Sequence, residues 1–200
     1  MGDEEAAAAQ EPGGGASATA GGRRRRRKGS GKSLGKGTTG KSGGGGQRPA
    51  SYWMVVTSPE NFRKTRELGF TIQGIKRRHR RRMDSVKPGD RVLYYVTGRM
   101  AFTATATVTS PVFEDHTPIW RSVRREEDYP WRVHIRADRV LDDASPIAAR
   151  DVAFRLEYVR KWPPEHWTLA FQGNLHQLPR TDFELIEGEL ERLRRRSGAA

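Results

Sequence analysis

The chain contains no cysteine and no apolar run close to the roughly 20 residues that span a bilayer. Without thiols, disulfides, thiolate metal sites and a cysteine nucleophile are excluded. The arginine run at residues 23–27 is followed by Gly, Ser and Lys rather than by an apolar stretch, so it does not resemble an export signal. We therefore expect a cytoplasmic protein without a membrane partner.

Aromatic side chains are also absent from the first fifty residues, although charge is plentiful there. Residues 1–50 carry ten Lys/Arg and four Asp/Glu, and residues 51–200 carry twenty-seven and twenty. The first segment cannot bury enough apolar surface to offset the entropy of ordering. We predict a disordered basic Gly/Arg/Lys-rich tail over residues 1–50 and one folded domain over 51–196. Both parts are basic, which favours a polyanionic partner such as nucleic acid.

The tail holds a letter-for-letter match to the phosphate-binding loop pattern at residues 35–42, GKGTTGKS. That motif works only when a buried strand precedes it and a helix follows it, because the backbone amides must converge on phosphate. Here the flanking residues are Gly, Ser and Lys on one side and a glycine run on the other. We interpret the match as a chance product of composition, and the tail as an electrostatic accessory with salt-sensitive affinity for phosphate.

The folded part predicts an α+β protein. Ser58 and Pro59 suit the start of a helix that Gly69 ends. In the strand at 100–110, alternation places Phe102 and Ala104 on the same face. The sequence predicts strands at 52–56, 91–97, 100–110, 130–141 and 174–178, and helices at 59–68, 75–86, 147–159 and from a capping box at Thr181 to about Arg195. A small curved mixed β-sheet or open barrel flanked by helices fits this order best.

Three separate motifs resemble the EVE domain family, in particular its prokaryotic branch. They are YWMVVTSPENF at 52–62, KPGDRVLYY at 87–95, and EHW at 165–167 followed by AFQGNLH at 170–176. The resemblance implies a PUA/YTH-like pseudo-barrel and a binding module that reads a modified base in DNA or RNA, rather than a catalyst. Other members carry a W-D-G motif after the first helix, where this chain has Ile72-Gln73-Gly74 and therefore lacks that aromatic wall.

Candidate ligand-binding residues surround the predicted pocket. Asn61 and Ser58 lie at a helix N-terminus, where an Asn can pair with a base edge or simply cap the helix. Gln73 offers the same chemistry beside Gly74, whose missing side chain lets a ring approach the backbone. Trp120, in a long polar loop, is the best candidate for stacking a base. The remaining candidates are His79 in a basic segment and Trp167, Phe171 and Asn174 in the C-terminal motif.

The segment at residues 76–82, here called the basic segment, carries six cations in seven residues. On a helix these like charges repel by a few tenths of a kcal/mol for each i,i+4 pair, which a polyanion would relieve. We predict that they bind phosphate: Lys76, Arg77, Arg78, Arg80, Arg81 and Arg82.

No pattern in the sequence supports a metal, a cofactor or a catalytic residue. The five histidines lack the spacing of converging zinc ligands, and no Ser/His/Asp arrangement or carboxylate pair appears in a motif frame. The leading hypothesis is a nucleic-acid reader with a base pocket beside a basic helix. The alternatives are an enzyme that acts on a nucleotide or base in the same pocket, and a scaffolding protein that recruits partners through its tail.

Overall fold

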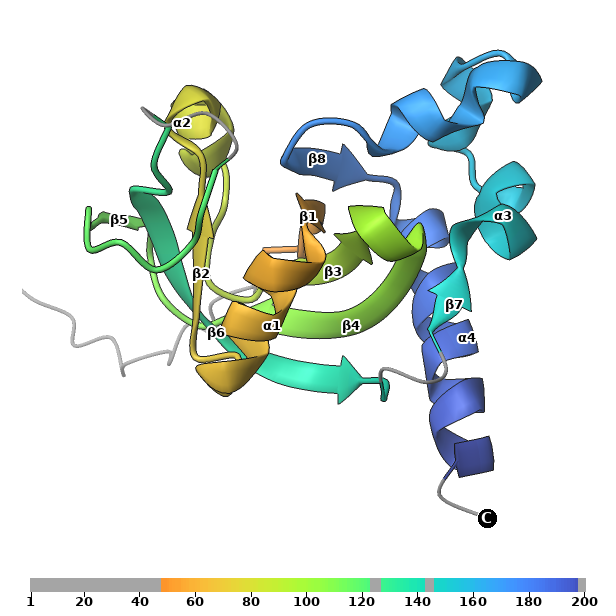
Figure 1. Ribbon diagram of the computed structural model, residues 1–200, viewed down its shortest axis with the longest axis horizontal. Coiled ribbons are helices and arrows are strands. Elements are labelled where there is room, and N and C mark those ends of the chain that lie inside the picture. The colour runs from red at the N-terminus through yellow and green to blue at the C-terminus, as the bar shows by residue number, and fades with distance from the viewer. Residues whose placement is uncertain (1–47, 123–126, 143–145, 198–200) are drawn as a thin grey trace, which may run out of the picture. The chain divides into compact units, whose positions relative to one another are not determined.

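A computed structural model describes residues 48–122, 127–142 and 146–197. The predictions for residues 1–47 of the tail, including the pattern at 35–42, fall outside these residues. Residues 48–50 of the predicted tail are described, and Arg48 pairs with Asp90 at 2.5 Å. Within them the main architecture is a curved mixed sheet with helical segments packed against it (Figure 1). This confirms the predicted α+β fold with a curved mixed sheet flanked by helices.

The sheet contains one parallel strand pair among antiparallel ones. Its order is β2-β6-β4-β3-β1-β8, with β5 on β6 and β7 on β4. Strand β1 runs parallel to β3 and antiparallel to β8. The strands are β1 (Tyr52–Thr57), β2 (Ile72–Ile75), β3 (Arg91–Val96), β4 (Ala101–Val108), β5 (Phe113–Glu114), β6 (Trp131–Val140), β7 (Ile147–Ala148) and β8 (Leu175–Leu178). The strands predicted at 52–56, 91–97, 100–110, 130–141 and 174–178 are therefore present.

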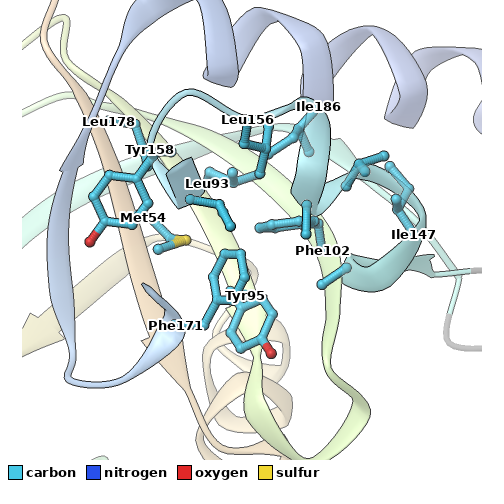
Figure 2. Packing of buried hydrophobic residues seen from close by; sticks show 14 of the residues in the cluster. Met54, Leu93, Tyr95, Phe102, Ile147, Leu156, Tyr158, Phe171, Leu178 and Ile186 are labelled. Carbon is cyan, nitrogen blue, oxygen red and sulfur yellow. The ribbon is translucent and has the colours of Figure 1, made fainter. Parts of the chain in front are cut away.

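The outer face of the sheet carries the first hydrophobic cluster. Alternate residues of β1 and β3, among them Met54 and Tyr95, pack against the C-terminal helical segments (Figure 2). Phe171 stacks on Tyr95 with ring centroids 4.5 Å apart. The long helix α4 (Arg180–Ser197) contributes Phe183 and Ile186, both fully buried.

The inner face carries a second cluster, which helix α1 (Pro59–Glu67) covers. Trp53 and Tyr94 point into it, and Phe62 from α1 packs on Tyr94 with centroids 5.7 Å apart. The Ser58 side chain accepts a hydrogen bond from the Asn61 amide at 3.2 Å, as a helix N-cap does. The predicted start of this helix is therefore confirmed.

The helix predicted at 75–86 is wrong. Ile75 is the last residue of β2, and only two short turns follow, η1 (Arg77–His79) and α2 (Arg80–Met83). The apolar positions of this segment, Ile75, Met83 and Val86, all join the inner cluster. The strand pairing of β2 with β6 overrides the helical pattern, because local propensity is a weak prior against tertiary contacts.

The long helix predicted at 147–159 is also wrong. The segment begins as β7 and continues as short turns, α3 (Ala149–Val152), η3 (Ala153–Arg155) and η4 (Val159–Lys161); η5 (Pro164–Phe171) follows. The last helix begins at Arg180 rather than at a capping box on Thr181. Asp182 is buried and accepts hydrogen bonds from the amides of Glu157 and Tyr158 at 2.9 and 2.7 Å, so its carboxylate holds this irregular segment.

The predicted alternation in β4 fails at one position. Phe102 belongs to the outer cluster, whereas Ala104 and Ala106 belong to the inner one. The register between β3 and β4 shifts between Tyr94 and Tyr95, which oppose Ala104 and Phe102. A bulge of this kind inserts one residue and exchanges the faces beyond it, so Phe102 and Ala104 lie on opposite sides.

Candidate nucleic-acid interface

Asn61 fastens the segment at residues 115–122, here called the Trp120 loop, to helix α1. Its side-chain carbonyl accepts from the Arg121 amide at 2.9 Å, and its Nδ2 donates to the Arg121 carbonyl at 2.7 Å. Nδ2 also lies 3.2 Å from the Tyr129 hydroxyl. Asn61 is buried. The bidentate pairing that the sequence suggested for a base edge is thus made with the backbone of this loop.

Trp120 lies against Gly74 and is buried rather than exposed in its loop. A Cβ at position 74 would stand 2.6 Å from the Cε3 atom of the indole, a separation that real Cβ atoms essentially never show. The indole Nε1 donates to Thr65 Oγ1 at 2.9 Å. Gly74 therefore does admit a ring close to the backbone, as the sequence suggested, and the ring is that of Trp120.

Arg132 holds the other end of the Trp120 loop. Its side chain is 2% exposed, and Nη1 lies 2.6 Å from an Asp115 carboxylate oxygen. It also donates to the carbonyls of Tyr129 and Thr117. Its guanidinium carbon lies 5.5 Å from the centroid of the Trp120 ring. A buried cation with this many partners fixes the loop, because leaving any partner unsatisfied is costly.

The Trp120 loop and residues 127–132 enclose a cavity of about 310 Å³, here called the base cavity. Trp120 and Tyr129 provide two aromatic walls, with ring centroids 6.1 Å apart and planes tilted by 51°. Polar groups from Ser122, Glu127 and Asp128 also line the cavity. The volume falls at the small end of the range typical of ligand sites, in which apolar rings and a few placed polar groups combine.

Three of the six cations of the basic segment pair with two carboxylates of this same region. Glu127 pairs with Lys76 at 2.8 Å and with Arg78 at 2.9 Å. Asp128 pairs with Arg77 at 3.2 Å. Burial raises the pKa of Glu127, but the hydrogen bonds from Lys76 and Ser122 and the nearby cations outweigh it, so the net pKa is lowered. The carboxylate therefore stays ionised and paired.

The other three cations of the segment have different surroundings. Arg80 pairs with Asp84 on the next turn, and its guanidinium carbon lies 4.5 Å from the Trp131 ring centroid. Arg82 donates to the Leu175 carbonyl. Arg81 is exposed. The structure thus groups these residues around two short turns rather than around one basic helix.

The remaining predicted residues do not meet at the base cavity. Gln73 is buried, accepts from the Tyr94 hydroxyl at 2.9 Å and donates to the Gly74 carbonyl. Asn174 is buried and joins β1 to the end of β2, through Val56 and the Lys76 amide. Trp167 is partly buried and packs on Phe171 in the outer cluster.

Two histidines near the interface have shifted pKa values in opposite directions. Burial, with the positive charges of Arg78 and Arg82, lowers the pKa of His79 to about 4. His116 lies between Asp128 at 2.5 Å and Glu114 at 3.0 Å, and these hydrogen bonds raise its pKa. His79 is therefore neutral at physiological pH, while His116 is stabilised in its charged form.

Among the described residues, no three His, Cys, Asp or Glu side chains converge as a metal site. None of the helices in the described ranges is both long and apolar enough to cross a bilayer.

The aromatic and charged groups that complete the base cavity were not predicted from the sequence. Tyr129, Glu127 and Arg132 lie at the end of a long loop and on an alternating strand, where nothing in the local pattern separates them from solvated side chains. The length of the loop between β4 and β6 was the one usable signal, since long connections in compact domains are often functional.

A curved mixed sheet flanked by helices, as found here, is a PUA/YTH-like fold. The family model described as EVE domain matches residues 51–187, and the chain belongs to the EVE domain family. A UPF0310 protein from Pyrococcus abyssi is 29% identical over 154 residues, which cover 70% of this chain and 99% of that protein. A UPF0310 protein from Pyrococcus horikoshii is 26% identical over 153 residues, covering 68% and 97%.

Solved YTH domains share the fold. The YTH domain-containing protein Mmi1, in a complex with RNA, matches with a TM-score of 0.55 at 10% identity and covers 74% of this chain and 87% of its own. The YTH domain of the Zygosaccharomyces rouxii MRB1 protein, in complex with N6-methyladenosine RNA, matches with a TM-score of 0.52 at 18% identity, covering 70% and 86%. At these identities the likeness establishes the fold alone.

Proposed function

We propose that this protein binds nucleic acid and takes one base, preferably a modified one, into the base cavity. The observation that carries the proposal is a cavity of about 310 Å³ with two aromatic walls, Trp120 and Tyr129, and carboxylate acceptors beside them. Aromatic rings bind bases favourably, and since Trp120 and Tyr129 are 7% and 8% exposed, only a small part of each ring is available to the base. The solved complex of a similarly folded YTH domain with N6-methyladenosine RNA supports this choice.

The polar groups of the cavity favour a base that carries an exocyclic amino group. Glu127 and Asp128 are ionised and therefore accept hydrogen bonds but cannot donate them. An amino group of adenine, cytosine or guanine donates to such an acceptor, and a singly methylated amino group keeps one N–H for it. The base must leave its stack to enter, which costs a few kcal/mol and least in a single strand.

The same ionisation makes Glu127 and Asp128 poor candidates for acid–base chemistry. The hydrogen bond from Arg77 lowers the pKa of Asp128, and His116 lowers it further. A general acid or base would need a pKa near the working pH. Neither carboxylate on the described cavity wall has its pKa moved in that direction. His116 also lines the cavity and has a pKa raised above its ordinary value, so the enzyme alternative would depend on this residue.

The test compares full-chain protein binding to matched single strands that differ in one base. RNA and DNA strands with one N6-methyladenine are measured against unmodified strands, and nucleosides retained by the purified protein are identified by mass spectrometry. We expect tighter binding of a modified strand and loss of that preference in Tyr129→Ala and Glu127→Gln. Phe154→Ala removes an aromatic side chain that is 60% exposed on η3 and should leave the preference unchanged. Equal affinity for all strands together with no retained nucleoside would overturn the proposal.

A further inference from the structure

A second cavity, of about 420 Å³, lies between helix α1 and the Trp120 loop and is here called the α1 cavity. It shares residues 118–121 with the base cavity, which lies between the same loop and residues 127–132. Four residues span at most roughly 14 Å. The two cavities are therefore neighbours, close enough for a strand with one base in the base cavity to reach the α1 cavity.

Three exposed cations line the α1 cavity: Arg63 and Lys64 from α1 and Arg121 from the loop. Their side chains are 72%, 48% and 84% exposed. Their acidic neighbours are Glu67, at 3.9 Å from Arg63 and 3.2 Å from Lys64, and Glu60, at 3.6 Å from Arg121. Ion pairs this exposed contribute little, so these cations can exchange a carboxylate for a phosphate at small cost.

One cation of the basic segment, Lys76, is held more firmly than these three. The Lys76 side chain is 17% exposed, and its partner Glu127, which also binds Arg78, is 13% exposed. A phosphate that took Glu127's place would leave a mostly buried carboxylate without its cations, which is strongly unfavourable. Lys76 is therefore less available to phosphate than Arg63, Lys64 or Arg121, whereas the phosphate-binding role predicted for the exposed arginines of the basic segment stays a prediction.

We propose that the α1 cavity is a phosphodiester subsite, at which Arg63, Lys64 and Arg121 hold the backbone of the strand whose base enters the base cavity. This inference rests on the proposed function and adds the path of the strand, across α1 rather than across the basic segment. Because these contacts are made to phosphate, they position the strand without reading its sequence.

The test measures the salt dependence of binding to a mixed-sequence RNA strand of about 12 nucleotides. The full-chain protein is compared with a triple variant at the α1 cavity: Arg63→Ala, Lys64→Ala, Arg121→Ala. The slope of log K against log salt should fall by about 2, because each phosphate contact on a single strand contributes roughly 0.7. Affinity at physiological salt should fall roughly tenfold. The modified-to-unmodified preference should not change.

Two further triple variants with the same charge change serve as controls. One lies on α4, away from α1 (Figure 1), and should leave the slope unchanged: Arg192→Ala, Arg195→Ala, Arg196→Ala. The other lies on the basic segment and should lower the slope less than the α1 variant does: Arg77→Ala, Arg80→Ala, Arg81→Ala. Glu67→Gln, which removes a negative charge from the α1 cavity, should strengthen binding.

The outcomes separate the two proposals. If the basic-segment variant lowers the slope and the α1 variant does not, the subsite is overturned while the reader stands. If modified and unmodified strands bind equally but the α1 variant still lowers the slope, the base preference fails and the phosphodiester subsite stands. Wild-type protein that binds no strand overturns both.

Discussion

The indole of Trp120 occupies the space that a side chain at position 74 would need. A Cβ on Gly74 would stand 2.6 Å from the Trp120 Cε3 atom and 3.0 Å from the Tyr129 carbonyl oxygen. The glycine therefore lets the loop wall of the base cavity pack directly onto β2. Trp120 can therefore pack in this position only because residue 74, which is 46 positions away in the sequence, has no side chain.

Gly74→Ala should displace Trp120 and destabilise the domain by about 1–3 kcal/mol, the usual cost of overpacking. Urea unfolding followed by tryptophan fluorescence measures it. The matched control is Gly188→Ala on α4, where a Cβ meets nothing within 4 Å. That change should stabilise the protein by up to about 1 kcal/mol, because alanine favours the helix. Equal stability of wild type and Gly74→Ala would contradict the close contact.

Asn61→Leu should release the Trp120 loop from α1. The change removes both hydrogen bonds to the Arg121 backbone and leaves the buried Tyr129 hydroxyl with one contact fewer. We expect a loss of about 2 kcal/mol and faster hydrogen exchange in residues 115–122, measured by mass spectrometry. Ser58→Ala removes only the helix cap and should cost about 1 kcal/mol without changing exchange in the loop. Unchanged loop exchange in Asn61→Leu would be inconsistent with this role.

Because of His116, the Trp120 loop should be better protected from hydrogen exchange in mild acid than in base. Its folded-state pKa is raised by Asp128 and Glu114, so its contribution is complete below the ordinary value near 6.5 and is lost as the pH rises through the raised value. Hydrogen exchange of the loop, corrected for the intrinsic pH effect, should show less protection above that range. His116→Gln should abolish the difference. A pKa at or below 6.5 in an NMR titration would count against the ion pairs with both carboxylates.

His79 should make the folded protein less stable as the pH falls below neutral. Its pKa falls to about 4 in the folded protein because of burial and the neighbouring cations. The unfolded chain takes up the proton near pH 6.5, so stability is complete above that value and decreases as the pH falls toward 4. Urea midpoints measured between pH 7 and 4 should fall less steeply in His79→Gln than in the wild type. Parallel pH profiles for the two proteins would contradict this assignment.

Much of the sheet could be predicted because its signals are local. A strand such as β1 is an apolar run bounded by Ser58 and Pro59, and the cap of α1 depends on residues three positions apart. Alternation failed only where the β3–β4 register shifts beside Phe102. The helix predicted at 75–86 also failed because of a contact that is distant in sequence. Ile75 pairs with Trp131 of β6, and this pairing makes Ile75 part of a strand.

The amino-acid sequence by itself determined the fold class, the positions of five strands and the family, since these rest on periodicity, caps and motifs. Only the tertiary structure decided the character of the site. Glu127 and Lys76 pair across 51 positions, and Asn61 and Arg121 across 60. Such contacts pair Lys76, Arg77 and Arg78 with carboxylates, bury Trp120 and leave the exposed cations of α1 beside a cavity. No local pattern records them, because they exist only once the sheet has curled and brought the loop onto α1.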